Sequence, residues 1–152
     1  MKLAEALILR SDRKKRLELL KDRLARVVKV QEGDMPSEDP AALLDEVDRT
    51  TTELTGLIRQ INRTNSTVRL DDGRTIADAI ADRDDLQLRH SILNGVIQSA
   101  VIRQDRFTKS EIRYQTTIDV SALQKRADDL AQSYRELDTK IQSANWLIDL
   151  IE

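Results

Sequence analysis

Apolar residues recur every three or four positions over four long stretches of the chain, and short polar stretches separate them. This period places the apolar side chains on one face of an α-helix. The pattern predicts helices at about 2–31, 40–63, 76–104 and 121–151. The first two should run antiparallel because only a short loop joins them. The sequence therefore predicts a mainly α protein, built as an antiparallel four-helix bundle or coiled coil.

The apolar period changes to two between the second and third helices. Val68 and Leu70 precede Asp71-Asp72-Gly73, where the glycine can adopt a positive φ without steric cost. A small β-hairpin is therefore predicted over about 67–76. A second alternating run of β-branched and aromatic residues predicts a short strand or extended crossover over about 111–119. The two segments could pair as a ribbon at one end of the helices.

Local signals mark where the helices begin and end. Gly33 is the expected C′ residue of the first helix, and Asp39 is the expected N-cap of the second, with Pro40 at its first position. The polar run 62–66 should end the second helix, because short polar side chains compete for backbone hydrogen bonds. Ser121 is the expected cap of the last helix.

The last helix carries an apolar seam with alternating spacings of four and three residues, which is typical of a coiled coil. With only 3% aromatic residues, the chain has few bulky side chains for a large core of its own, so we expect a homo-oligomer. A monomeric bundle could use the same seam. The expected interface residues are Leu130, Tyr134, Leu137, Ile141, Trp146 and Ile148.

Composition narrows the possible partners and locations. The 152 residues suit a single domain, and the formal net charge of −2 argues against a dedicated nucleic-acid binder. The basic first helix should instead pair with the acidic second helix. No apolar window is long enough to span a membrane, and the apolar run at the N-terminus is too short for a signal peptide. We expect a cytoplasmic protein without nucleic-acid or membrane partners.

Candidate chemistry is sparse. The absence of cysteine excludes thiolate chemistry, and the single histidine, His90, lies in an apolar seam without the spacing of a metal motif. We expect it to be a polar residue of the bundle, bonded to Arg10 or Thr51. An acidic run on one face of the third helix could bind a hard cation, although such runs commonly begin helices. It contains Asp78, Asp82 and Asp85. No catalytic residue, metal or cofactor is predicted.

One polar cluster offers a candidate ligand site. Asn62, Thr64 and Asn65, together with Arg83, could bind a small ligand or nucleotide, whereas the alternative is a hydrogen-bonded helix end. Two functions of different classes follow. The first is a non-enzymatic protein that acts by self-association or partner binding. The second is a small-ligand- or nucleotide-dependent enzyme with its site at this cluster.

Several segments spread over nearly the whole chain resemble a bacterial family often labelled septicolysin. They are residues 30–33, 57–65, 83–84, 106–112 and 138–146. The resemblance implies a helical protein with a small β element and no assigned reaction. The label suggests a cytolysin, which is the weaker alternative because the chain has no membrane-length apolar segment.

Overall fold

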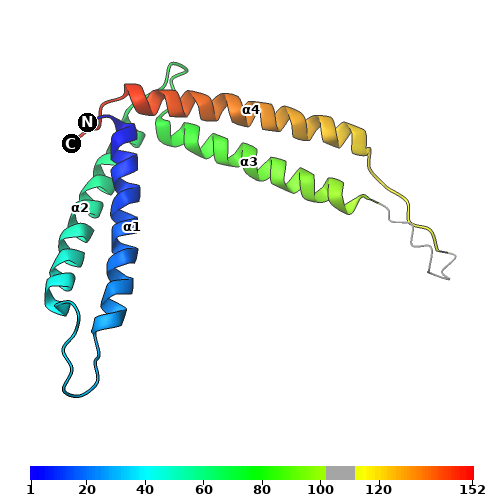
Figure 1. Ribbon diagram of the computed structural model, residues 1–152. Coiled ribbons are helices and arrows are strands. Elements are labelled where there is room, and N and C mark those ends of the chain that lie inside the picture. The colour runs from blue at the N-terminus through cyan, green and yellow to red at the C-terminus, as the bar shows by residue number, and fades with distance from the viewer. Residues whose placement is uncertain (102–111) are drawn as a thin grey trace. The chain divides into compact units, whose positions relative to one another are not determined.

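The computed structural model describes residues 1–101 and 112–152. Within them the chain forms α1 (Leu3–Val27), α2 (Pro40–Thr67), α3 (Ile76–Ser99) and α4 (Val120–Leu147), as Figure 1 shows. These residues contain no β-sheet, so the prediction of a mainly α protein is confirmed. The helices form two compact units, unit 1 (1–77 and 142–152) and unit 2 (78–141). The four-helix bundle topology stays a prediction.

In unit 1, α1 and α2 form an antiparallel hairpin. The second helix begins as predicted, since the Asp39 carboxylate accepts a hydrogen bond of 3.0 Å from the Ala41 amide and Pro40 occupies the first turn. An apolar cluster closes the hairpin near its loop. It contains Leu20, Val27 and Leu43, with Leu24 and Val47 packed against it. Burial of this cluster is the main stabilising contribution at that end of the hairpin.

Ion pairs join the middle of α1 to α2. Arg13 Nε lies 2.6 Å from a carboxylate oxygen of Glu53, and Arg16 Nε lies 2.7 Å from Glu46. The predicted pairing of a basic first helix with an acidic second helix is therefore present. Because these side chains are partly exposed, each pair contributes at most about 1 kcal/mol. The ion pairs align α1 with α2 more than they add to the free energy of unfolding.

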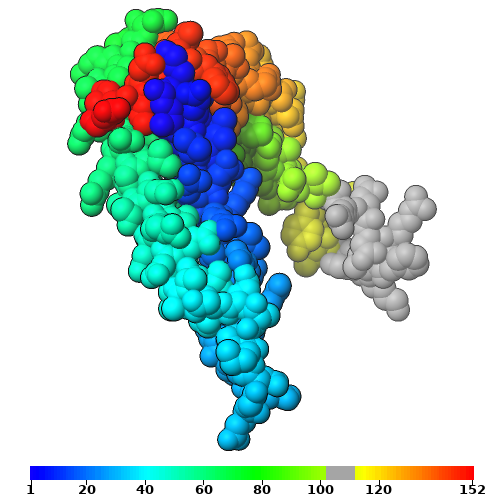
Figure 2. All heavy atoms as spheres, turned by 60° about the vertical axis from the view of Figure 1, so that its left-hand side comes forward, coloured from blue at the N-terminus to red at the C-terminus, as the bar shows by residue number. Residues whose placement is uncertain are grey.

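The chain ends form a second contact in unit 1, which we call the terminal clasp (residues 1–3 and 147–151). The Leu3 amide donates to the Ile148 carbonyl and the Leu150 amide to the Met1 carbonyl, both at 2.9 Å. Figure 2 shows the red C-terminal residues against the blue N-terminal ones. The prediction that the last helix continues to 151 is wrong, because α4 ends at Leu147 and the following residues pair with the other end of the chain.

Side chains reinforce the terminal clasp. The Lys2 ammonium lies 2.9 Å from the Asp149 carboxylate, and this hydrogen bond lowers the pKa of Asp149. Thr64, which is fully buried near the end of α2, accepts a hydrogen bond of 2.9 Å from the Ile151 amide. The terminal clasp therefore satisfies backbone groups that a frayed tail would leave to water.

The segment after α2 is a tight turn, and the structure does not support a β-hairpin of two strands over 67–76. Arg69 and Thr75 form one isolated antiparallel bridge, and no strand extends from it. The polar run 62–66 does not end α2, which continues to Thr67. Gly73 does adopt the predicted positive φ, at +84°. Gly33 is also at positive φ, but it lies beyond the C-cap, which is Val28.

In unit 2, α3 and α4 are joined by an ion pair between Arg83 and Asp138, at 3.1 Å. The buried apolar residues of its described part are Ala79, Ala127, Leu137 and Ile141. The cap of α4 is Asp119 and not Ser121, since the Asp119 carboxylate accepts a hydrogen bond of 3.0 Å from the Ala122 amide. The third helix was predicted to reach 104, but α3 ends at Ser99.

Of the two alternatives predicted for 111–119, a short strand or an extended crossover, the strand is not found among the described residues. Residues 112–119 belong to no strand, and residue 111 lies outside the described residues. The chain here is extended without a ladder partner among the residues described, so the expected ribbon with the 67–76 turn does not form. The alternating residues favour an extended backbone, but no second strand lies beside them among the described residues.

Two glycines with open surroundings allow a matched test of the turn. An added Cβ would meet no heavy atom within 4 Å at Gly56, inside α2, or at Gly73. Gly56→Ala is expected to stabilise the fold by about 0.5–1 kcal/mol through helix propensity. Gly73→Ala is expected to destabilise it by about 1 kcal/mol because its φ is positive. Urea unfolding followed by circular dichroism measures both, and changes of the same sign would contradict this account.

Candidate functional site

The α3 helix carries apolar residues on two faces. Residues in a helix advance by about 100° each, so Leu88, Ile92 and Val96 share one side, away from the part-buried Leu86 and Ile97. The side chains of Leu88, Ile92 and Val96 are 60%, 56% and 39% exposed. We call these three residues the outer stripe. A helix with a second apolar face has more apolar surface than its own hairpin covers.

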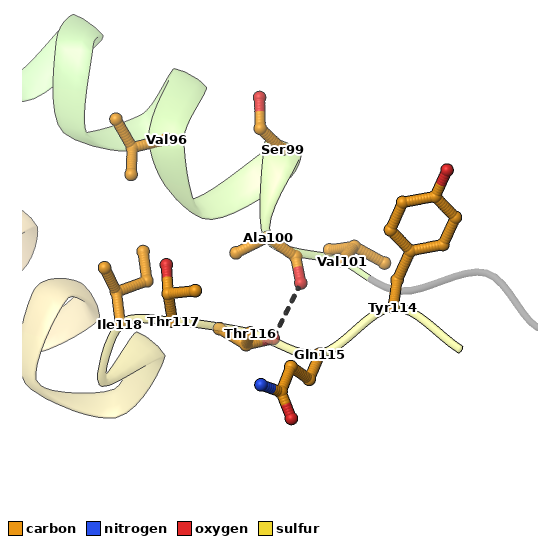
Figure 3. A pocket seen from close by; sticks show the side chains of 9 residues that line it. All are labelled: Val96, Ser99, Ala100, Val101, Tyr114, Gln115, Thr116, Thr117 and Ile118. Carbon is orange, nitrogen blue, oxygen red and sulfur yellow. Dashed lines mark hydrogen bonds between the residues drawn. The ribbon is translucent and has the colours of Figure 1, made fainter. Parts of the chain in front are cut away.

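A hollow of about 430 Å³ lies at the end of α3, where it meets the segment that leads into α4. Figure 3 shows the end of α3 on one side of the hollow and residues 114–118 on the other. The Thr116 hydroxyl donates to the Ala100 carbonyl at 3.3 Å, which holds the extended segment against the helix end. Val96 belongs both to the outer stripe and to the hollow, so the two form one continuous surface.

The described residues that line this hollow are neutral. They supply hydroxyl groups, one amide and apolar side chains. Tyr114, whose side chain is 83% exposed, is the largest side chain at its rim. Exposed aromatic and aliphatic residues around an open hollow are typical of a protein-binding surface.

The residues of the predicted ligand cluster differ in their contacts, and the ligand site stays a prediction. Thr64 is buried, donates to the Gln60 carbonyl at 2.8 Å and accepts from the Ile151 amide at 2.9 Å. Asn62 is exposed and Asn65 is half-buried, both on α2 of unit 1. Arg83 lies in unit 2 and binds Asp84 and Asp138; these hydrogen bonds, the one to Asp84 first, raise its pKa.

His90 and the acidic run form no site among the described residues. The His90 ring lies 3.4 Å from the amide nitrogen of the Asn94 side chain, one turn along α3. Arg10 and Thr51 belong to unit 1, so the expected bond from His90 to one of them stays a prediction. Asp85 pairs with Arg89 at 2.7 Å. No three acidic or histidine side chains in the described ranges come together as a metal site would require.

The predicted interface residues differ in how much of their surface is buried. Leu137 and Ile141 are buried inside the chain, whereas Leu130, Tyr134 and Ile148 are half-buried. Trp146 is 57% exposed, and its neighbour Leu147 is 75% exposed. The seam of α4 is thus largely covered by the chain itself. Of the predicted set, Trp146 alone is strongly exposed in this structure.

A second hollow, of about 420 Å³, lies between α1 and α2. Arg13 and Arg16 line it together with the glutamates that pair with them, and Arg49 and Asp12 complete a balanced set of charges. Charges that already neutralise one another offer little to a ligand of either sign. This hollow is a solvated polar layer in the hairpin.

Comparison with protein families identifies the group to which the chain is related. Residues 10–150 match the model of a family described as "Family of unknown function (DUF6847)". The chain belongs to this family. The DUF6847 description carries no activity, and it does not include the septicolysin label, so that resemblance stays a prediction. No curated protein matches the chain.

A solved structure resembles this DUF6847 chain over nearly its full length. It is the crystal structure of a functionally unknown conserved protein from Corynebacterium diphtheriae, with 42% sequence identity and a TM-score of 0.92. The match covers 99% of both chains. Among the described residues, no helix combines the length and apolar character needed to cross a membrane. Neither comparison supplies a reaction or a ligand.

Sequence reasoning missed the outer stripe, although the signal is present. Leu88, Ile92 and Val96 recur every four residues, on a different face of α3 from its predicted seam. Assigning one apolar face to each helix hides a second one. The hollow could not be predicted, because it depends on where α3 ends and on the hydrogen bond that holds Thr116.

Proposed function

We propose that this protein is non-enzymatic and acts by self-association, with a second copy covering the outer stripe and the hollow at the end of α3. The single observation that supports it most is the exposure of the outer stripe on a helix that already buries another face. Its location in the cytoplasm stays a prediction from the sequence.

The small core of unit 2 supports the same proposal. Its described part buries only two large apolar side chains, Leu137 and Ile141, while Leu88, Ile92 and Tyr114 remain more than half exposed. A two-helix unit gains stability when further helices cover its apolar faces. Two-fold symmetry is the commonest arrangement of homo-oligomers, and it brings the same patch of both copies together. A second copy therefore pairs apolar surface with apolar surface.

The test is the mass in solution. Light scattering on a size-exclusion column should give at least twice 17.4 kDa for the wild type. Ile92→Asp should lower the mass to that of one chain, because an unpaired carboxylate in an apolar contact costs several kcal/mol. Since Ile92 is exposed in the single chain, its helical content should not change.

The matched control is Leu44→Asp on α2. Leu44 is 53% exposed and Ile92 is 56% exposed, so the two substitutions place a carboxylate at similarly accessible apolar positions. The Leu44→Asp protein should keep the mass of the wild type. A monomeric wild type at micromolar concentration, or an equal loss of mass in both variants, would contradict the proposal.

A further inference from the structure

Residues 113–118 form an extended segment whose backbone groups make no backbone hydrogen bond with other described residues. Every residue from 113 to 118 is exposed. Every second residue is β-branched or aromatic, as Tyr114 and Ile118 are, and the residues between them are polar. A sequence of this kind is suited to a strand, and here it presents an open edge that another chain can join.

We propose that two copies of this chain pair along this segment as antiparallel strands, with Thr116 of each copy facing Thr116 of the other. The inference rests on the self-association proposed above and specifies where the copies meet. The pairing would satisfy the free backbone groups and cover the rim of the hollow at the end of α3. It would also place Val96, the last residue of the outer stripe, at the edge of the contact.

The side chains of the segment are complementary to themselves in this register. Centring on Thr116 places Arg113 opposite Asp119 of the second copy, at both ends of the paired strands. It also places Tyr114 opposite Ile118 of the second copy. Opposite charges, aromatic with β-branched residues, and threonine with threonine are the cross-strand pairs that stabilise antiparallel strands.

Other registers lose these pairs. A parallel in-register arrangement would set Arg113 against Arg113 and Asp119 against Asp119, which is destabilising. Moving the centre to Gln115 or Thr117 keeps the strands antiparallel but removes the pairing of Arg113 with Asp119. The pattern of charges therefore selects one register.

The local structure leaves the required groups available. The Asp119 carboxylate caps α4 through Oδ1, and Oδ2 accepts no hydrogen bond from the described residues. It can therefore accept one from Arg113 of the second copy. Thr116 is anchored to the Ala100 carbonyl, so the centre of the segment is held in place before a second copy arrives. Such preorganisation lowers the entropic cost of association.

Single cysteines test the register, because the natural sequence contains none. Residues that face each other across antiparallel strands have Cα atoms about 4.5–5.5 Å apart, within the range of a disulfide. Thr116→Cys should therefore form a disulfide-linked dimer under mild oxidation, on a gel run without reductant. Gln115→Cys alone and Thr117→Cys alone should not, because each lies diagonally from its own copy, at about 7–8 Å.

A mixture supplies the decisive comparison. Gln115→Cys mixed with Thr117→Cys should form the disulfide that neither variant forms alone, since residues 115 and 117 face each other in this register. Equal linkage of all three single variants, or none in Thr116→Cys and in the mixture, would overturn the register. If the wild type still has the mass of two chains in that case, the proposed self-association stands. A wild type with the mass of one chain would overturn both proposals.

Discussion

Replacing Leu20 by alanine is expected to destabilise unit 1 by about 2–5 kcal/mol. The Leu20 side chain is fully buried, and it belongs to the apolar cluster with Val27 and Leu43. Truncation removes its transfer free energy and leaves a cavity that two helices close only in part. Urea unfolding monitored by far-ultraviolet circular dichroism measures the loss.

The adjacent residue is the control. Leu19 has the same chemistry and the same helix, but its side chain is 49% exposed. Leu19→Ala should cost less than about 1 kcal/mol, because little buried area is lost and no cavity forms. Similar losses for Leu19→Ala and Leu20→Ala would mean that α1 does not present the described face to α2.

Thr64→Val is expected to destabilise the protein by about 1–3 kcal/mol, although the two side chains have nearly the same shape. The Thr64 hydroxyl accepts the hydrogen bond of the Ile151 amide, and valine would leave that amide without its partner. The cost is that of a buried donor left unpaired. The loss should appear as a lower midpoint of thermal unfolding.

Thr52→Val separates this effect from helix propensity. Both threonines lie in α2 and donate to the carbonyl four residues earlier, Thr52 at 2.9 Å and Thr64 at 2.8 Å. Thr52 is exposed and accepts nothing from the tail, so its replacement should change stability by less than about 0.5 kcal/mol. An equally small effect at position 64 would show that the tail contact does not contribute.

The sequence predicted helices well where the signal is local. The start of α2 follows from Asp39 and Pro40, because a cap and a fixed φ act on neighbouring residues. The pairing of basic α1 with acidic α2 follows from composition and a short loop. Gly73 was assigned a positive φ for the same local reason.

Features that depend on distant residues could not be predicted. The sequence predicts that the polar run 62–66 ends α2. In the structure α2 continues to Thr67, and Thr64 accepts a hydrogen bond from the Ile151 amide near the C-terminus. The spacing of Ile148 and Ile151 predicts that α4 continues to 151. In the structure, residues 148–151 bond instead to α2 and to the start of the chain. Spacing alone does not show which residue an apolar side chain will contact.

The prediction of the functional site is limited for the same reason, because a sequence does not show which distant residues come into contact. The polar cluster close in sequence stays a prediction as a ligand site, and the sequence does not show that Thr64 hydrogen-bonds inside the protein. The alternating pattern of 112–118 was recognised, but its partner strand was sought within the chain. A single sequence shows what a segment favours, and it does not show whether the partner belongs to the same molecule.

The connectivity of unit 1 implies an order of folding. Its two segments are separated in sequence by the whole of unit 2, residues 78–141. The ion pairs of the α1–α2 hairpin join residues 30 and 40 positions apart, whereas the bond from Lys2 to Leu147 joins residues 145 positions apart. Closing a longer loop costs more entropy, and contacts distant in sequence form more slowly. The helical hairpin should therefore form early, and the terminal clasp should close only after the intervening helices have become compact.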